Sequence, residues 1–134
     1  MIERLVILVI VSAAGYAAWK LFQCWQVRCA ALSAPVDPLL EARRPDVPAI
    51  VYFTSPMCVP CKTQQRPAIQ QLLAELGDSV QVIEVDASEQ PDAANRWGVM
   101  SVPTTFILDR HGQPREINNG ITGPDKLKRQ LMGL

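Results

Sequence analysis

The sequence is poor in residues on which many catalytic and nucleic-acid-binding proteins depend. It has one histidine, His111, among 134 residues, so a mechanism that needs two imidazoles is excluded. Thirteen basic residues are balanced by thirteen acidic ones, which gives a formal net charge of zero. Because nucleic-acid-binding proteins usually carry an excess of basic residues, this balance argues against nucleic acid as a partner.

Cysteine is also scarce, with Cys24, Cys29, Cys58 and Cys61 as its four occurrences. Structural zinc is usually held by two close pairs of Cys or His, and only Cys58 and Cys61 form a close pair here. Cys61 is followed by Lys62 rather than by histidine, so the attachment pattern of c-type haem is missing. No metal or cofactor is therefore expected. The pair itself is open to three interpretations: half of a metal site, a structural disulfide or a redox-active dithiol.

Charged residues are missing from positions 5–19, and the apolar character continues past Lys20. A helix rises about 1.5 Å per residue, so roughly 20 residues cross a hydrocarbon core of about 30 Å. Aromatic residues typical of a membrane interface gather at the end of this segment: Tyr16, Trp19, Phe22 and Trp25. We expect residues 1–25 to form a single-pass anchor in membrane lipid. A cleaved signal peptide is the alternative, because small residues at positions 12–18 offer a cleavage site.

The charges that flank this segment predict its orientation. Arg4 and the N-terminal amine precede it, whereas Lys20, Arg28, Arg43 and Arg44 follow it. Positively charged flanks stay preferentially in the cytoplasm, so the bias favours a cytoplasmic C-terminal domain. The difference is a few charges, and an extracytoplasmic domain is the alternative.

Residues 26–47 are predicted to form a linker, because four prolines fall between positions 31 and 48. Within the linker, Pro38 suits the first turn of one short helix over residues 37–44. The chain length leaves room for one domain after the linker, over residues 48–134.

Strand and helix patterns alternate in this domain. Continuous apolar runs predict buried strands at 49–54 and 80–87, and the more polar run 115–119 predicts an edge strand. The predicted order is strand 49–54, helix 62–76, strand 80–87, helix 91–98, strands 104–109 and 115–119, and a last helix from residue 124. A strand–helix–strand unit implies parallel strands, and the final strand pair implies a hairpin, so the sheet is predicted to be mixed.

Three features of this domain resemble the thioredoxin family. The motif CVPCK, residues 58–62, follows a predicted buried strand and opens a helix. The run SVPTTFIL, residues 101–108, is similar to the cis-proline loop of that family, with Pro103 as the cis proline. Gly120 and Leu127 then lie seven residues apart at the start of a terminal helix. The resemblance implies an α/β thioredoxin fold, a mixed central sheet flanked by helices, over residues 48–134.

The motif has a chemical rationale of its own. A thiol attacks a disulfide as the thiolate, and free cysteine titrates near pH ~8.5. A helix that begins at Cys58 presents unpaired N–H groups and a partial positive charge to its sulfur, and Lys62 adds a further charge. We therefore expect Cys58 to be the nucleophile and Cys61, one turn later, to resolve the mixed disulfide. Pro60, preceded by Val59, fixes the first turn without loss of a hydrogen bond.

The resemblance implies a second contribution to the site, from Val102 and Pro103. In the family the cis proline lies against the cysteines, and the residue before it offers backbone groups to an extended substrate. Several residues depart from the family pattern, among them Val59, where typical members have glycine, and Pro67, the helix proline, which lies one place later than usual. The usual tryptophan before the first cysteine is Met57, the buried aspartate is Tyr52, and the lysine that accompanies that aspartate is Val82. These departures concern how the second cysteine loses its proton and not the dithiol itself.

The sequence thus predicts a membrane-tethered thiol–disulfide oxidoreductase. It is expected to act as a disulfide reductase, since no histidine between the cysteines stabilises the reduced form. The expected partners are protein disulfides and dithiols, together with an upstream thiol reductase or membrane electron donor. Two alternatives are a non-catalytic thioredoxin-fold module that delivers Cu(I) or assists assembly, and a peroxidase of the same fold.

Cys24 and Cys29 are predicted to be ordinary thiols near the membrane surface, because residues five apart do not share one helix face well. A second redox pair that relays electrons to the CVPC dithiol is the alternative, as is a site of lipid modification.

Overall fold

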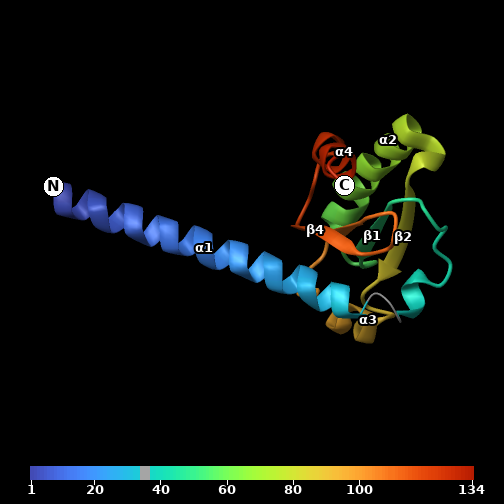
Figure 1. Cartoon of the computed structure of the whole chain (residues 1–134), viewed down its shortest axis with the longest axis horizontal. Helices are drawn as coiled ribbons and strands as arrows, with labels where there is room; N and C mark the ends of the chain where they lie inside the picture. Colours follow the sequence, from blue (N-terminus) through green and yellow to red (C-terminus); the bar gives the residue numbers. More distant parts are fainter. Residues whose placement is uncertain (34–36) are drawn as a thin grey trace.

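The computed structural model describes residues 1–33 and 37–134. A long N-terminal helix, α1, leads into a domain built on one four-stranded sheet (Figure 1). The elements in chain order are α1 (Ile2–Ser33), the 3₁₀ turn η2 (Pro38–Leu40), β1 (Ala49–Thr54), the π-helical turn η3 (Cys61–Gln65), α2 (Arg66–Leu76), the 3₁₀ turn η4 (Gly77–Ser79), β2 (Gln81–Asp86), α3 (Pro91–Arg96), β3 (Thr104–Leu108), β4 (Pro114–Asn119) and α4 (Pro124–Met132).

The sheet has the strand order β2-β1-β3-β4. β1 pairs with β2 in parallel and with β3 in antiparallel fashion, and β3 and β4 form the final hairpin. The predicted mixed sheet and the predicted edge strand at 115–119 are therefore confirmed. The prediction of a second buried strand at 80–87 is wrong in part. β2 occupies the other edge of the sheet, where β1 is its only partner strand among the described residues, and Val85 is its only buried residue.

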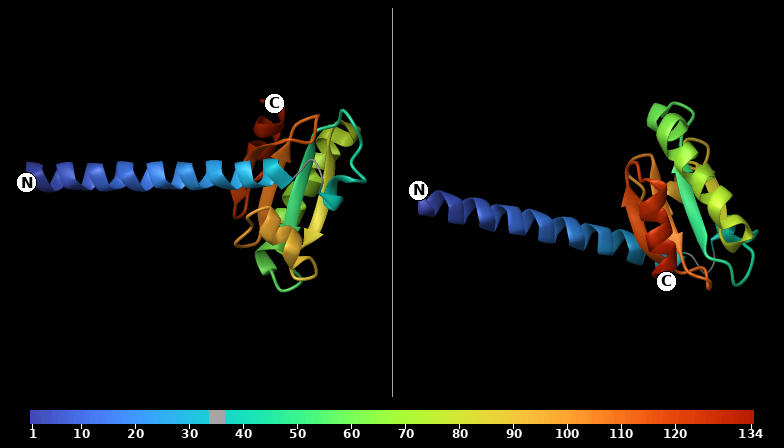
Figure 2. Two further views of the ribbon diagram at one scale, coloured as in Figure 1. Left: turned by 60° about the horizontal axis from the view of Figure 1, so that its bottom comes forward. Right: turned by 90° about the horizontal axis from the view of Figure 1, so that it is seen from above.

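Figure 2 shows the long helix α1 reaching the sheet from one side. Side chains of the central strands alternate between two packed layers, as the pleat of a strand requires. On one face, Val51 and Phe53 pack with Trp97 and with Ala30 of α1. On the other face, Ile50 and Tyr52 pack against α2 and α4 through a second cluster, which includes Ile69, Leu72 and Leu127. The sheet is thus covered on both faces, by α2 and α4 on one side and by α3 and the end of α1 on the other.

Helix α1 is longer than the predicted anchor and extends into the domain. It continues without interruption through residue 25 to Ser33, so the first part of the predicted 26–47 linker is helical. Gln26 and Ala30, one turn apart, are both fully buried against the domain, which explains why the helix continues. Residues 34–36 of the predicted linker lie outside the described residues. The helix predicted at 37–44 is a single 3₁₀ turn, Pro38–Leu40.

The part of α1 that precedes the domain is exposed and apolar. Its mean hydropathy is 2.0 over a window of which no part is buried in the structure, so α1 is long and apolar enough to cross a membrane. A signal sequence near an N-terminus would also meet these criteria of length and apolar composition.

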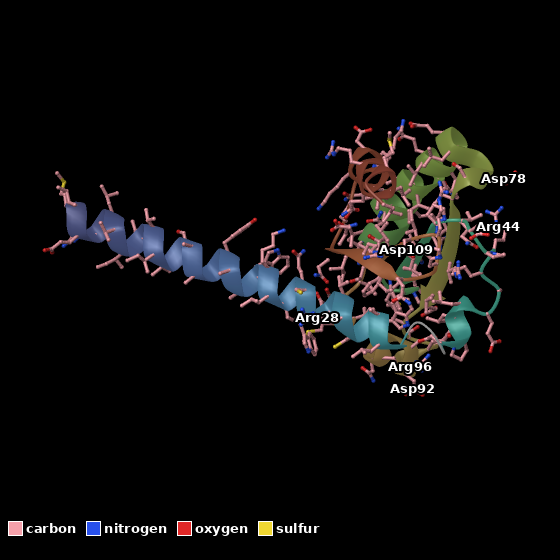
Figure 3. All side chains as sticks on the ribbon, viewed as in Figure 1. Arg28, Arg44, Asp78, Asp92, Arg96 and Asp109 are labelled. Carbon is pink, nitrogen blue, oxygen red and sulfur yellow. A yellow bond between two sulfur atoms is a disulfide. The ribbon has the colours of Figure 1, made fainter. Side chains whose placement is uncertain are left out.

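Asp37 joins the segment after α1 to α3 from a nearly buried position, with 5% of its surface exposed. The indole N–H of Trp97 donates to its Oδ2 at 2.7 Å, and Arg96, which lies on α3 beside the end of α1 (Figure 3), donates at 3.1 and 3.2 Å. The backbone N–H of Leu39 also donates to Oδ1. Burial by itself would raise the pKa of Asp37, but the hydrogen bonds from Arg96, Leu39 and Trp97 hold that pKa below its ordinary value.

We expect Asp37→Asn, which removes the charge but keeps the shape, to lower the free energy of unfolding by about 1–3 kcal/mol at pH 7. Since the pKa is lower in the folded than in the unfolded state, the carboxylate stabilises the fold above the unfolded pKa. This stabilisation is lost as the pH falls through the folded pKa. Urea unfolding of the full chain in detergent at pH 7 and at pH 3 measures the effect, which should shrink at pH 3.

The exposed carboxylate of Asp78 provides the matched control. Asp78→Asn should change the free energy of unfolding by less than about 0.5 kcal/mol at either pH. An Asp37→Asn effect of equal size at both pH values would contradict the electrostatic account of this contact.

Candidate redox-active site

The site begins where the buried strand β1 ends. A tight turn follows Thr54, in which the backbone N–H of Cys58 donates to the carbonyl of Ser55 at 3.1 Å. The helix starts immediately afterwards, with Pro60 in its first turn, where a missing N–H has no cost. The hydroxyl of Thr63 donates to the carbonyl of Val59 at 2.9 Å and closes this turn. Strand, turn and helix together fix Cys58 at the helix N-terminus.

Cys58 and Cys61 form a disulfide, with an S–S distance of 2.08 Å and a Cα–Cα distance of 5.3 Å. The two sulfurs differ in access, because Cys58 is half-buried whereas Cys61 is fully buried. Cys24 and Cys29 are free thiols on α1, the first exposed and the second half-buried. The structure thus joins the two cysteines of the CVPC motif with each other and with neither of the others.

The first turn of the helix directs a hydrogen-bond donor at the outer sulfur. The backbone N–H of Cys61 lies 3.2 Å from the Sγ of Cys58 and donates to it. This N–H is one of the groups that a helix leaves unpaired at its N-terminus, and it carries part of the positive end of the helix dipole. A negative charge on the Cys58 sulfur would therefore be stabilised in place. Lys62, predicted to support the site, is exposed, as are Val59 and Pro60.

Tyr52 lies beneath the inner cysteine, at the sequence position where the family has a buried aspartate. Its hydroxyl donates to the carbonyl of Cys61 at 3.1 Å and lies 3.3 Å from the hydroxyl of Thr54. That carbonyl belongs to the π-helical turn, where the N–H of Arg66 bonds to it five residues later. Burial raises the pKa of Tyr52 above its ordinary value, so the phenol stays neutral at physiological pH. Tyr52 therefore orients the helix start and does not supply a negative charge.

The segment between α3 and β3 carries the predicted substrate-contacting residues, Val102 and Pro103. The Val102–Pro103 peptide bond is cis, and the carbonyl of Pro103 accepts a hydrogen bond from the N–H of Gly120 at 2.9 Å. Val102 and Cys58 are both half-buried and pack against the same core cluster, beneath α2 and α4. The loop predicted from the SVPTTFIL run and the CVPC motif thus pack against one core cluster.

Three exposed apolar side chains belong to these two segments. Met57 is 89% exposed, Val59 is 66% exposed, and Met100, in the segment before Val102, is 78% exposed. We call these three residues the apolar rim. Sequence reasoning noted Met57 and Val59 as motif neighbours but did not identify Met100, because a single methionine in a loop carries no periodic signal.

Comparison with known proteins, like the geometry of the site, indicates a thioredoxin. A family model described as Thioredoxin matches residues 39–132. The thioredoxin of Bacillus subtilis (strain 168) is 29% identical over 98 residues, which are 73% of this chain and 92% of that protein. The chloroplastic thioredoxin Y of Oryza sativa subsp. japonica is 32% identical over 95 residues, 71% of this chain but 54% of that longer protein.

Solved structures share the fold. The oxidised form of mitochondrial thioredoxin 3 from Saccharomyces cerevisiae superposes with a TM-score of 0.59 at 26% identity, and the match covers 69% of this chain and 82% of the yeast chain. The family match includes the sheet, the dithiol and the cis-proline loop, whereas α1 lies outside it. The chain therefore belongs to the thioredoxin family of thiol–disulfide oxidoreductases.

Proposed function

We propose that this protein is a membrane-tethered disulfide reductase that exchanges electrons with other proteins through Cys58 and Cys61. One observation carries the proposal: a disulfide at a helix N-terminus, with its outer cysteine half-buried and its inner cysteine fully buried. A disulfide that closes so short a loop adds little to stability through chain entropy, which favours a chemical role.

The reaction begins with the reduced dithiol. The Cys58 thiolate attacks one sulfur of a substrate disulfide, the substrate S–S bond breaks, and the released sulfur leaves as a thiolate that takes up a proton. Cys61 then loses its proton to solvent or to that leaving group and attacks the Sγ of Cys58. The mixed disulfide breaks, and the second substrate thiol departs. Two electrons pass to the substrate, and the Cys58–Cys61 disulfide remains.

The different burial of the two sulfurs supports this order of events. An incoming disulfide can reach Cys58, whereas fully buried Cys61 is shielded from it. The 5.3 Å between the two Cα atoms lets Cys61 reach Cys58 without unfolding the helix. Cys58 is accordingly proposed as the attacking residue and Cys61 as the resolving one.

Recognition of the substrate is assigned to the loop and the apolar rim. Val102 would offer its backbone groups to an extended segment of the partner, with Pro103 holding that backbone in place. The apolar rim would contact non-polar side chains beside the partner's disulfide. Because methionine adapts its shape to different surfaces, Met57 and Met100 suit a protein that serves more than one partner.

The direction of electron flow is proposed to be towards the substrate. The residues between the cysteines, Val59 and Pro60, offer no side-chain donor that would stabilise the reduced form. The oxidised protein must then be reduced again by an upstream dithiol, from a soluble thiol reductase or a membrane-bound electron donor. No organic cofactor is required, since all electrons travel on sulfur.

We expect Cys61→Ser to abolish turnover but to form a stable mixed disulfide with partner proteins, because the resolving step is lost. Cys58→Ser should abolish turnover and trap nothing, and this difference identifies the attacking residue. Non-reducing gels and reduction of insulin by the full chain measure both outcomes. In the wild-type protein, equilibrium with glutathione should give a reduction potential more negative than about −180 mV.

Two results would contradict this scheme. A potential above that value would make the protein an oxidant. Absence of disulfide turnover together with tight Cu(I) binding by the reduced dithiol would favour the metal-delivery alternative instead.

The tether is proposed to be α1. An exposed apolar helix of this length is costly in water, and its C-terminal turns are part of the folded domain. The interfacial aromatic residues lie just before the buried Gln26, so the domain would lie directly on the membrane surface. The basic flank that follows, including Arg28 and Arg44, favours the cytoplasmic side.

The full-length chain should remain in the membrane pellet after alkaline carbonate extraction, with its N-terminus intact, because the span inserts into the bilayer. Protease added to intact cells should leave the domain uncut if it is cytoplasmic. A soluble mature protein that begins near residue 15–20 would show instead that the segment is a cleaved signal peptide.

A further inference from the structure

The last turns of α1 are built into the domain that carries the active site. Gln26 and Ala30 are both 0% exposed, and Ala30 belongs to the core cluster that contains Trp97 and Phe106. A fully buried amide such as that of Gln26 is tolerated only when its polar atoms are hydrogen-bonded. The partners of Gln26 therefore identify what this part of α1 holds in place.

Gln26 binds two separate segments of the domain. Its Nε2 donates to the carbonyl of Gly98 at 3.0 Å, and its Oε1 accepts from the Nδ2 of Asn119 at 3.0 Å. A longer contact of 3.4 Å, from Nε2 to the Oδ1 of Asn119, completes a reciprocal pair of amides. Gly98 has a φ of +67°, and Trp25 lies close enough to contact a side chain placed there. Helix α1 therefore packs closely against the backbone at Gly98.

These two partners flank the substrate-contacting loop. Gly98 opens the segment that runs to Pro103, with Met100 and Val102 between them. At the other end, Asn119 precedes Gly120, whose N–H donates to the carbonyl of Pro103 at 2.9 Å. The Gln26 side chain thus hydrogen-bonds to both backbone segments that flank the loop, at Gly98 and at Asn119.

We propose that Gln26 is a positioning residue for substrate binding: it sets the position of loop 98–103 relative to Cys58 and makes the membrane helix part of the substrate site. The proposal rests on the proposed exchange reaction, since the loop matters only if a partner disulfide binds there. The proposal also gives the continuous helix a function beyond attachment. A tilt of α1 would move the Gln26 side chain and, through its hydrogen bonds, loop 98–103.

The thiol chemistry should be independent of Gln26. The donor to the Cys58 sulfur is the N–H of Cys61, which belongs to the helix that follows β1. Loss of the Gln26 amide would displace Met100 and Val102 but leave that donor unchanged. A positioning role therefore predicts weaker binding of protein substrates with unaltered reactivity of the dithiol, whereas a general loss of structure would change both.

The test compares Gln26→Met, which keeps the size of the side chain but removes its hydrogen bonds, with the wild-type full chain in phosphatidylcholine nanodiscs. KM for reduction of insulin should rise about three- to tenfold, the effect of losing one or two net hydrogen bonds, with kcat changed less than twofold. The alkylation rate of Cys58 and the equilibrium with glutathione should stay at their wild-type values. Gln23→Met, on a half-buried glutamine three residues earlier, is the matched control and should leave KM unchanged.

Asn119→Ala removes the other half of the amide pair from a half-buried position. It should raise KM in the same direction, and its effect should not add to that of Gln26→Met, since both remove one linkage. If Gln26→Met fails to fold, Asn119→Ala alone gives the deciding KM.

Wild-type turnover with an unchanged KM in these variants would overturn this proposal alone. A parallel change in kcat, alkylation rate and glutathione equilibrium would also overturn it in favour of a purely structural role. No turnover by the wild-type protein would overturn the proposed function, and this proposal with it.

Discussion

The hydrogen bond from the Cys61 N–H to the Cys58 sulfur is the interaction on which the chemistry of this protein depends. It exists because a helix begins directly after a buried strand, so that unpaired N–H groups are directed at a half-exposed sulfur. Other features of the site maintain this arrangement. Pro60 fits the first turn, Tyr52 holds the Cys61 carbonyl from below, and the burial of Cys61 leaves Cys58 as the accessible partner. The fold thus places the Cys58 sulfur where a backbone N–H at the start of a helix donates to it.

Helix α1 precedes the part of the chain that matches the thioredoxin family. The family match begins at residue 39, whereas the buried Gln26 and Ala30 precede it and complete one face of the sheet. Helix α1 is thus exposed and apolar over most of its length, whereas its last turns are part of the hydrophobic core of the domain. The junction is further secured by Asp37, which receives hydrogen bonds from Trp97 and Arg96 of the helix beneath it. The end of α1 and the thioredoxin-fold domain are consequently packed together at this point.

Much of this could be predicted from the sequence, because short-range patterns determine it. The apolar run 49–54 forms β1 with all residues buried, Cys58 and Cys61 are joined in a disulfide, and the Val102–Pro103 peptide bond is cis. The errors concern long-range packing. The burial of β2 depends on whether a further strand pairs with its free edge. The residue pattern of 80–87 does not predict whether such a strand is present. The continuation of α1 depends on Gln26, whose burial follows from the distant Gly98 and Asn119. Met100 is exposed in the segment before Val102, a position that periodicity does not describe.

The pH dependence of Cys58 alkylation tests the central claim most directly. In a chain with Cys24 and Cys29 replaced by serine, the reduced protein would be treated with iodoacetamide at a series of pH values, and modification of Cys58 followed by mass spectrometry. Stabilisation of the thiolate at the helix N-terminus predicts a midpoint clearly below the value of about 8.5 for free cysteine. A midpoint at or above that value would contradict the account, since the helix would then contribute nothing to the reactivity of the sulfur.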